Sequence, residues 1–583
     1  MCGIIGYIGL HPEQNLLNGL KKLEYRGYDS AGMTVRREGR FETYKEVGQV
    51  QNLSGKVVYK EEFGMGIAHT RWATHGKISI ENTHPHFSVS GEVALVHNGI
   101  IENFEELKEK NKDVTYLGQT DSEVVAKMFE SLSINSLRKV LKKLVGSYAL
   151  ALLSKEGDYL YFAKNKSPLY LAKGKECAVI ASDPSCFSGL CENYYQLDDG
   201  DYGKISLKNI VIYNKNHKIV EKTPQKLDFN YLSEDKSGYE HFMIKEIYQS
   251  RLALENIIEK YSHSEMKENL SKIKNYNFDR VYLVGCGTAY HAGLIGEHYL
   301  RENINIDVYC LVASEFKDSN LLVDNNSLCI FISQSGETAD SISALEYCKE
   351  KGAKIISITN VEYSTIAKMS DINLPIFAGQ ERAVASTKAY FAMCAVLFIL
   401  SNYLKGQNYI LPLKTLSHKI DFGNDISLKK LAKTLAVYKN LFFIGRGVDY
   451  VTALEASLKL KEITYIFSSA LPSGELKHGS LALIDSNLPC LVIATDERQF
   501  AKTLNNASEI KSRGGKLILF TSLFVEKDVE ENFDYIIKIT PLPRDLMPMQ
   551  IILSLQKLAY FTSLEKGNDP DKPRNLAKSV TVE

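Results

Sequence analysis

The second half of the chain contains an internal repeat, which restricts the possible fold more than any other feature. Each copy begins with an apolar run that ends in a Gly-x-Gly turn, at Val281–Gly287 and again at Leu441–Gly447. Two more apolar runs follow at nearly equal distances in the two copies, and helical stretches separate them. Fully apolar strands that alternate with helices indicate a parallel sheet covered on both faces. The repeat therefore predicts two α/β doubly wound domains, at about residues 265–412 and 432–573.

The loop Ser333–Thr338, with the sequence SQSGET, follows the second apolar run of the first copy. Ligands of such sheets bind beyond the carboxyl ends of the strands. Three hydroxyls, a glycine and a helix N-terminus can hold a phosphate there without a lysine. The alternative is an ordinary helix N-cap, although a cap needs only one hydroxyl. The second copy has Ala494–Glu497 at this place, so we expect one phosphate site per chain, in the first copy.

Residues 1 to about 228 show a different pattern, in which short β-type runs alternate with glycine-rich turns. Apolar and amphipathic patterns predict strands at 4–8, 64–69 and 93–97 and helices at 12–24 and 120–130. This order of elements is typical of a layered α+β domain and not of a βαβ array.

Cys2 stands directly after the initiator methionine. We expect Met1 to be removed because cysteine is small, which would leave a thiol and a free α-amine on one residue. Both groups titrate near neutrality, with reference pKa values of about 8.5 and about 7.7–8.0. The amine can then act as base for its own side-chain nucleophile. The alternative is that Cys2 is a small buried residue that opens a strand.

Five stretches near the N-terminus carry a family resemblance. They are MCGIIGYIG from residue 1, LEYRGYDSAG from 23, HTRWATHG from 69, HNGIIENF from 97 and GQTDSE from 118. Together, and in this order, they resemble the N-terminal-nucleophile glutaminase domain of class II amidotransferases. The resemblance implies an αββα fold in which Cys2 attacks the side-chain amide of glutamine, giving a γ-glutamyl thioester and ammonia.

The resemblance also assigns the groups around this nucleophile. Asn98, through its side-chain amide, and Gly99, through its backbone N–H, would form the oxyanion hole. Arg71 would hold the α-carboxylate of glutamine in a bidentate fork, and Asp121 would pair with its α-ammonium. From the residues alone, Arg71 could form a surface ion pair, Asn98-Gly99 a hairpin turn and Asp121 a helix N-cap.

Three further positions lie inside the stretch HTRWATHG. The resemblance implies that Thr74 and His75 line the glutamine pocket. Trp72, the only tryptophan of the chain, takes the position that shuts an ammonia channel in the family. The alternative for Trp72 is a large core side chain.

The loop SQSGET resembles the sugar-phosphate loop of the sugar isomerase (SIS) domain family. The stretch Val384-Ala385-Ser386-Thr387-Lys388 resembles a second wall of the same site. The resemblance implies that the sugar phosphate is bound by Ser333, Gln334, Ser335, Thr338, Val384, Ser386 and Thr288.

The second copy contributes charged groups. Glu455, Lys459 and Glu462 are spaced i, i+4 and i+7, which places them on one helical face. The alternative is a solvent-exposed Glu–Lys pair, but this helix directly follows a Gly-x-Gly turn, where a site should open. His478 follows in the stretch GELKHG, and Lys578 lies in the final stretch RNLAKSVTVE.

Taken as a whole, the chain resembles the isomerising glutamine–fructose-6-phosphate aminotransferase family, the glucosamine-6-phosphate synthases. The resemblance implies that ammonia released at Cys2 is transferred to fructose-6-phosphate with ketose–aldose isomerisation. The products are glucosamine-6-phosphate and glutamate, in the first step of amino-sugar (UDP-N-acetylglucosamine) biosynthesis. His478 would open the sugar ring, Lys578 would form a Schiff base with the C2 ketone, and Glu462, assisted by Lys459, would move a proton between C1 and C2.

The resemblance implies a homodimer in which His478 is shared across the interface, because the family builds each sugar site with this histidine from the neighbouring subunit. The alternative is that His478 only makes hydrogen bonds within its own loop. The mechanism needs no metal or organic cofactor, and the sequence suggests neither.

Ala289 departs from the family pattern, since a serine often follows the stretch Cys286-Gly287-Thr288 there. This leaves open a glutaminase-linked SIS enzyme that acts on another sugar phosphate or on an amino-sugar phosphate. Another class II amidotransferase would need an ATP-pyrophosphatase loop or a phosphoribosyl-pyrophosphate loop, and the sequence has neither. A non-catalytic sugar-phosphate sensor would have no use for Cys2 and the C-terminal lysine together.

Composition limits the partners. The chain has 70 Lys plus Arg and 70 Asp plus Glu, which argues against nucleic acid or an anionic membrane as partner. Its ten cysteines form no CxxC pair or zinc-type cluster, as is typical of reduced thiols in the cytoplasm. The longest apolar run, Ala389–Leu400, is too short to span a bilayer and predicts a buried helix.

The predicted organisation has five segments. A glutaminase domain over 1–228 is followed by a linker and connecting helix over 229–264, the two SIS domains given above, and a C-terminal strap over 574–583. Pro570 and Pro573 favour an extended conformation at the start of this strap.

Overall fold

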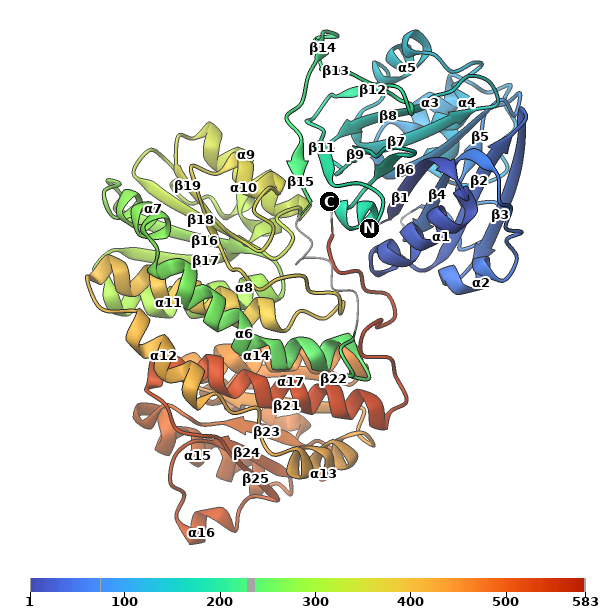
Figure 1. Cartoon of the computed structure of the whole chain (residues 1–583). Helices are drawn as coiled ribbons and strands as arrows, with labels where there is room; N and C mark the ends of the chain where they lie inside the picture. The colour runs from blue at the N-terminus through green and yellow to red at the C-terminus, as the bar shows by residue number, and fades with distance from the viewer. Residues whose placement is uncertain (1, 74, 228–235, 581–583) are drawn as a thin grey trace. The chain divides into compact units, whose positions relative to one another are not determined.

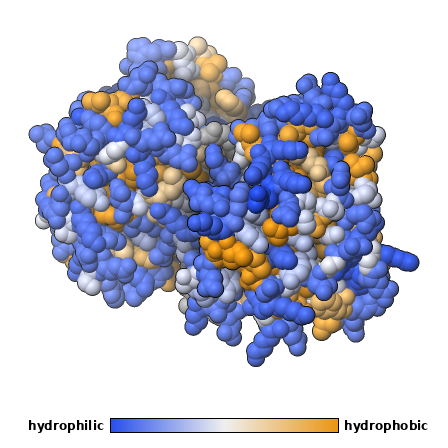
Figure 2. All heavy atoms as spheres, turned by 90° about the horizontal axis from the view of Figure 1, so that it is seen from above, coloured by the Kyte–Doolittle hydropathy of each residue, from blue (hydrophilic) through white to orange (hydrophobic). Residues whose placement is uncertain are grey.

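A computed structural model describes residues 2–580 except 74 and 228–235. These residues form two compact units (Figure 1): one holds residues up to 227 together with 577–580, and the other holds 236–576. No helix in the described part of the chain has the length and apolar character needed to cross a membrane. The face drawn in Figure 2 is mostly hydrophilic, with its hydrophobic residues in scattered groups.

The first unit is built on two antiparallel sheets. The larger has the order β15 (Gln225–Lys226), β11 (Asn193–Gln196), β9 (Tyr170–Lys173), β10 (Ala178–Ala181), β1 (Gly3–Leu10), β4 (Phe63–Arg71), β2 (Ser30–Arg37) and β3 (Arg40–Val47). The smaller has the order β14 (Ile219–Val220), β13 (Ile210–Tyr213), β12 (Tyr202–Ile205), β8 (Leu160–Asn165), β7 (Gly146–Ser154), β6 (Val93–Ile101) and β5 (His86–Phe87). Its helices are α1 (Pro12–Leu23), α2 (Val50–Ser54), α3 (Phe104–Glu109), α4 (Asp121–Lys127) and α5 (Ile134–Leu141).

Side-chain alternation along β1 shows how these layers stack. Ile5 packs with Leu16 of α1 in one apolar cluster, whereas Ile4 packs with Val96 of the second sheet in another. On its other face the second sheet packs against α4 and α5. Because successive strand residues point to opposite faces, β1 lies between a helix layer and a sheet. The predicted αββα arrangement, and the strands and helices predicted around Cys2, are confirmed.

The second unit contains two parallel sheets of five strands. The first has the order β17 (Asp307–Val312), β16 (Arg280–Gly285), β18 (Ser327–Ser333), β19 (Lys354–Thr359) and β20 (Ile372–Pro375). The second has the order β22 (Phe467–Pro472), β21 (Asn440–Gly445), β23 (Cys490–Ile493), β24 (Leu517–Thr521) and β25 (Tyr535–Lys538). Both sheets have the strand order 2-1-3-4-5, which confirms the predicted repeat. In this order the crevice for a ligand opens beyond the carboxyl ends of the first and third strands.

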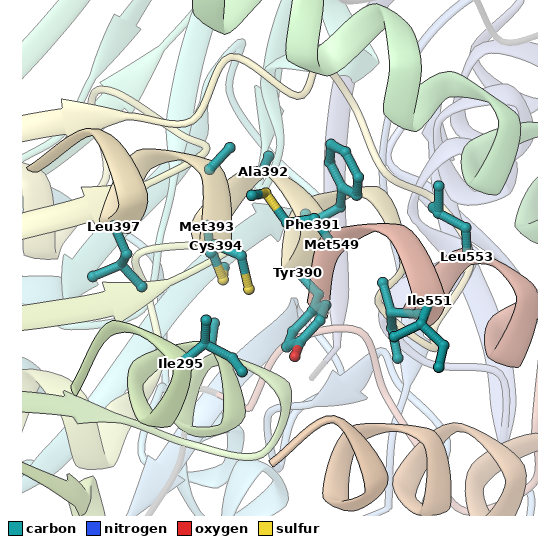
Figure 3. Close-up of a cluster of buried hydrophobic side chains, with 14 of the residues drawn as sticks. Ile295, Tyr390, Phe391, Ala392, Met393, Cys394, Leu397, Met549, Ile551 and Leu553 are labelled. Atoms are coloured by element: carbon teal, nitrogen blue, oxygen red, sulfur yellow. The ribbon is translucent and has the colours of Figure 1, made fainter. Parts of the chain in front are cut away.

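Helices cover these sheets. In chain order they are α6 (Phe242–Ser262), α7 (Ser264–Lys274), α8 (Thr288–Asn303), α9 (Ala339–Glu350), α10 (Thr365–Met369), α11 (Lys388–Lys405), α12 (Ile410–Lys419), α13 (Asp425–Leu435), α14 (Val448–Thr464), α15 (Glu497–Lys511), α16 (Lys527–Glu530) and α17 (Met547–Glu565). Helix α11 is the predicted buried helix. Figure 3 shows its side chains Tyr390 and Leu397 among Ile295 of α8 and Ile551 of α17, in one continuous core.

The described part of the linker and the residues up to 576, where the strap begins, lie at the two ends of the second unit. Part of the predicted linker lies outside the described residues, and the connecting helix is α6. The strap is not helical at its start, and the Asp571 carboxylate accepts hydrogen bonds from the N–H groups of Phe242 and Met243, at 2.8 Å each. Farther on, Arg574 N–H donates to the Tyr465 hydroxyl at 2.8 Å. Residues from 577 onward belong to the first unit.

Candidate active sites

Strand register places Cys2 beside the end of β4. Gly3 pairs with Thr70 across β1 and β4, so the residue before β1 meets the residues that follow β4. The Cys2 Sγ accepts a hydrogen bond from Trp72 N–H at 3.2 Å. Burial raises the pKa of the Cys2 thiol, and the Trp72 N–H and the charge of Arg71 oppose this only in part. The thiol therefore needs a base to become a nucleophile at neutral pH.

Asn98 and Gly99 lie inside β6, so the hairpin alternative is wrong. The Asn98 Nδ2 donates to the Cys2 carbonyl at 2.8 Å, which brings the amide to the nucleophile. Gly99 has a φ of 132°, and a Cβ at this position would lie 2.1 Å from the Ser147 carbonyl oxygen. Only glycine fits there. Of the two residues predicted to form an oxyanion hole, Asn98 thus contacts Cys2, and Gly99 follows it in the same strand.

Asp121 and Arg71 are both buried, at 4% and 2% exposure. Thr120, and not Asp121, is the N-cap of α4, since its hydroxyl accepts from Glu123 N–H. The Asp121 Oδ2 instead accepts from Ile101 N–H at 2.9 Å, which ties α4 to the end of β6. Arg71 is not a surface ion pair.

The Arg71 guanidinium holds the loop that follows β4. It donates to the Lys77 carbonyl at 3.1 Å and to the carbonyls of His75 and Gly76. Part of the predicted fork is therefore engaged by backbone. His75 packs edge-to-face on Phe104. Thr74 lies outside the described residues.

Trp72 is half-buried, which does not fit the alternative of a core side chain. Its ring makes an edge contact with Tyr28, with ring centroids 5.8 Å apart. Its backbone N–H donates to the Cys2 sulfur at 3.2 Å, so the residue that carries the ring is in direct contact with the nucleophile.

Sequence reasoning missed four buried histidines behind this site. His69 and His84 stack with ring centroids 4.0 Å apart, and His86 lies 4.6 Å beyond His84. The fourth, His97, lies with its Nδ1 2.8 Å from the Ser122 hydroxyl. Burial lowers the pKa of His69 to about 3 and also lowers the pKa values of the other three. The stretches HTR, THPH and HNG carried this signal.

In the second unit, the loop Ser333–Thr338 leaves β18 at the crevice. The Ser333 hydroxyl accepts from Gly336 N–H at 3.0 Å and lies 3.1 Å from the Thr338 hydroxyl. Gly336 has a φ of 64°, and a Cβ there would collide with Ser364. The Glu337 carboxylate is turned to Thr365, whose N–H and hydroxyl both donate to it at 2.8 Å. The acidic residue of this loop therefore has its own partner at the start of α10.

Glu381 braces the second wall of this crevice. Its carboxylate accepts from the Ser386 hydroxyl at 2.8 Å, from Thr387 N–H at 2.9 Å and from Ala389 N–H at 3.0 Å. Val384 N–H donates to the Asp571 carbonyl at 3.1 Å. The wall is thus attached both to the start of α11 and to the segment that precedes the strap.

The helical face predicted for Glu455, Lys459 and Glu462 is buried and not exposed. Glu455 and Lys459 have 0% exposure, and the Lys459 ammonium lies 2.6 Å from Glu462 Oε2 and 3.5 Å from Glu455 Oε1. Burial alone would lower the pKa of Lys459, but the two carboxylates outweigh it and the pKa is raised. Lys459 is therefore a charged ammonium between two acids.

Thr288, at the start of α8, joins the two SIS copies at this point. Its hydroxyl donates to Glu455 at 3.1 Å and accepts from Lys459 at 3.0 Å. One lone pair of the hydroxyl is left for another donor. The His291 Nδ1, one turn along α8, lies 2.8 Å from Glu455 Oε2. The charged face of α14 thus meets the crevice of the first copy.

Asp449 fills the equivalent crevice of the second copy. Its carboxylate accepts from Thr495 N–H at 2.7 Å and from Asp496 N–H at 3.1 Å, at the carboxyl end of β23. The corresponding residue of the first copy is Ala289, and both donate N–H to the residue three before them, at 3.1 Å. The Asp449 carboxylate of the second copy therefore takes the position that Ala289 leaves open in the first copy.

His478 and Lys578 lie in different parts of the structure. His478 ends a 3₁₀ helix over Ser473–His478, and its side chain is exposed. Lys578 is half-buried and lies in the C-terminal residues that belong to the first unit. In the described part of the chain, no group of three His, Cys, Asp or Glu is placed to hold a metal ion.

Comparison with known proteins bears directly on these sites. The SIS domain family matches residues 276–401 and 434–560, and the glutamine amidotransferase domain family matches 69–189. The chain is 40% identical to glutamine–fructose-6-phosphate aminotransferases [isomerizing] from Fusobacterium nucleatum and Bacillus cereus, with both partners of each alignment covered completely. The C-terminal domain of a glucosamine-fructose-6-phosphate aminotransferase from Francisella tularensis is 33% identical, with a TM-score of 0.53 over 58% of this chain and all of its own. By these matches the chain belongs to the isomerising glutamine–fructose-6-phosphate aminotransferase family.

Proposed function

We propose that this protein hydrolyses glutamine at Cys2 and transfers the ammonia to fructose-6-phosphate, yielding glucosamine-6-phosphate and glutamate. The observation that carries the proposal is that one chain of this family holds both sites. Cys2 lies in the first unit beside Asn98, which Gly99 follows in β6. In the second unit, the Lys459 ammonium lies between the carboxylates of Glu455 and Glu462. It also donates to Thr288, in the copy of the repeat that carries the loop Ser333–Thr338.

In the glutaminase half, the α-amine of a processed Cys2 takes the thiol proton, directly or through a water. The thiolate attacks the glutamine amide carbon, and the oxyanion is stabilised by Asn98 Nδ2 and Gly99 N–H. Collapse of this intermediate releases ammonia and leaves a γ-glutamyl thioester, which water hydrolyses to glutamate. Arg71 and Asp121 bind the ends of the substrate, Thr74 and His75 line its pocket, and Trp72 gates the ammonia.

In the sugar half, the phosphate is bound by the loop Ser333–Thr338 with Val384 and Ser386. Lys578 forms a Schiff base with the C2 ketone, which ammonia then displaces. Glu462 moves a proton from C1 to C2, assisted by Lys459, whose ammonium lies 2.6 Å from its carboxylate.

His478 assists opening of the sugar ring from the neighbouring subunit of a homodimer. Its exposed position in the single chain supports this role, since a side chain lent to a partner must reach beyond its own subunit. We place the enzyme in the cytoplasm because its proposed substrate is a sugar phosphate and its ten cysteines are free thiols.

The assay that tests this function supplies glutamine and fructose-6-phosphate and measures glucosamine-6-phosphate and glutamate. Equal amounts of both products are expected. Cys2→Ala should abolish glutamate release while the protein still binds fructose-6-phosphate. Product formation from a different sugar phosphate, with none from fructose-6-phosphate, would overturn the substrate assignment and leave the glutaminase assignment standing.

A further inference from the structure

Two cysteines of the first unit that the mechanism does not use lie in contact. Cys177 ends the turn between β9 and β10, and Cys191 lies two residues before β11. Because β9 pairs with both β10 and β11, the turn and the incoming segment meet at one edge. The two Sγ atoms are 3.9 Å apart, and each residue is 6% exposed.

This pair lines a cavity of about 920 Å³. The other lining residues come from β1, the start of α1, the β9–β10 turn and the segment before β11, and include Lys175 and Glu176. Cavities of this size accept small organic molecules. Gly174 closes the turn over the sulfurs, since a Cβ there would lie 2.9 Å from Cys177 Sγ and 3.5 Å from Cys191 Sγ.

The two thiols are not equivalent. A hydrogen bond from the Cys191 thiol lowers the pKa of Cys177 to about 7 although burial opposes it, whereas the pKa of Cys191 is raised by the same contact. The thiolate is the nucleophilic form of cysteine. This favours Cys177 as the attacking group of the pair, and Cys191, whose Sγ lies 3.9 Å away, is placed to resolve what forms on it.

We propose that Cys177 and Cys191 form an oxidisable dithiol site that undergoes exchange with a low-molecular-weight disulfide, RSSR. The Cys177 thiolate attacks one sulfur of RSSR, forming a protein–SR mixed disulfide and releasing RS⁻. The Cys191 sulfur then attacks Cys177 Sγ, releasing the second RS⁻ and forming the Cys177–Cys191 disulfide. The protein loses two protons and two electrons, and RSSR gains both to become two RSH.

The geometry requires only a small movement for the second step. The sulfurs must approach from 3.9 Å to the bond length of about 2.05 Å, which rotation about the two side chains can supply because they already touch. The bond would link the β9–β10 turn to the start of β11. The bond would close the loop over residues 177–191, and because it restricts the unfolded chain it should stabilise the first unit against unfolding.

The test uses the full chain with Cys2→Ala, so that the catalytic thiol does not react with the reagent. The protein is treated with oxidised glutathione, free thiols are blocked with N-ethylmaleimide, and disulfides are then reduced and labelled with iodoacetamide. Trypsin leaves Cys177, Cys186 and Cys191 in one peptide, since no Lys or Arg occurs between 176 and 203. Cleavage before Asp183 and after Phe187 separates the three cysteines for mass spectrometry.

We expect the iodoacetamide label on Cys177 and Cys191 and its absence from Cys186, whose Sγ instead faces the Gly19 carbonyl at 3.8 Å. Cys191→Ser should accumulate one glutathione on Cys177, and Cys177→Ser should accumulate little on Cys191. Cys186→Ser is the matched control and should form the disulfide like the parent. Reduced glutathione in excess should reverse the label.

Maleimide on both cysteines after oxidation would overturn the proposal, and so would a disulfide that includes Cys186. An unmodified Cys191→Ser protein with normal Trp72 fluorescence would also overturn it, because the attacking thiol would then be folded but unreactive. Activity is not the readout, so failure of the proposed function would leave these outcomes unchanged.

Discussion

The imidazole of His69 holds the side chain of Asn98. The His69 Nε2 lies 3.0 Å from Asn98 Oδ1 and 2.9 Å from the His97 carbonyl. Both partners are acceptors, so Nε2 carries a proton and donates it. An amide whose oxygen accepts from His69 must turn its Nδ2 the other way, toward Cys2. We therefore expect His69 to be a positioning residue for the proposed oxyanion hole.

Replacing His69 with alanine should lower kcat for glutamine hydrolysis by about tenfold to a hundredfold. The loss should be smaller than the 10²–10³ expected when an oxyanion donor itself is removed. KM for glutamine should change little, because the Asn98 amide is expected to stabilise the oxyanion and not to bind glutamine before the attack.

The control is His69→Gln, whose amide N–H can reach the same acceptors and should restore part of kcat. Sugar-phosphate binding by the second unit should stay at the parent level in both variants. A rise in KM with unchanged kcat would contradict the positioning role.

The buried histidines should make the first unit sensitive to acid. The pKa of His69 is lowered from 6.5 to about 3 by burial, so between these values the unfolded chain binds a proton that the folded chain does not. Stability is then fully present above about pH 6.5 and is lost as the pH falls toward 3, by up to about 1.4 kcal/mol per pH unit for each such histidine. Urea unfolding followed by Trp72 fluorescence reports this unit alone, since Trp72 is the only tryptophan. A free energy of unfolding that stays constant from pH 7.5 to 5.5 would exclude the effect.

The sequence was sufficient for the parts of the fold that depend on local pattern. Apolar runs predicted the parallel strands, and the repeat predicted two similar domains. Short matched stretches predicted that Cys2, Asn98 and Gly99 belong to one site. These predictions succeeded because each rests on neighbours in sequence or on one recognisable turn.

The missed features depend on which distant side chains meet. The ring centroids of His69, in β4, and His84, just before β5, lie 4.0 Å apart, and no local period encodes that meeting. Thr288 was assigned to the sugar, yet its hydroxyl also bridges Glu455 and Lys459. The role of Asp449 became visible only when the two copies could be compared atom by atom.

Subunit complementation should show whether His478 is shared. His478→Ala and Glu462→Gln homodimers should each be nearly inactive. In mixed dimers one sugar site would carry both defects and the other neither, so activity should return toward half that of the parent. Mixed dimers without recovered activity, despite mass-spectrometric proof of exchange, would place His478 in its own subunit's site.

The comparison of Asp449 with Ala289 predicts how the sugar site could be closed from within. In Ala289→Asp a carboxylate should reach the N–H groups at the end of β18, as Asp449 reaches Thr495 and Asp496 at the end of β23. Two such charge-assisted hydrogen bonds are worth about 1.5–3 kcal/mol each, and the same carboxylate repels a phosphate. Binding of fructose-6-phosphate, measured by calorimetry, should therefore weaken about a hundredfold or more.

Two variants separate charge from size at this position. Ala289→Asn has nearly the same shape without the charge and should weaken binding much less than Ala289→Asp. Ala289→Ser, which restores the residue often found in the family, should bind at least as well as the parent. A thermal unfolding curve like that of the parent is the check that the second unit, which holds residue 289, is folded in each protein. If Ala289→Asp binds the sugar phosphate as tightly as the parent, residue 289 does not face the phosphate, and the crevices of the two copies are not equivalent.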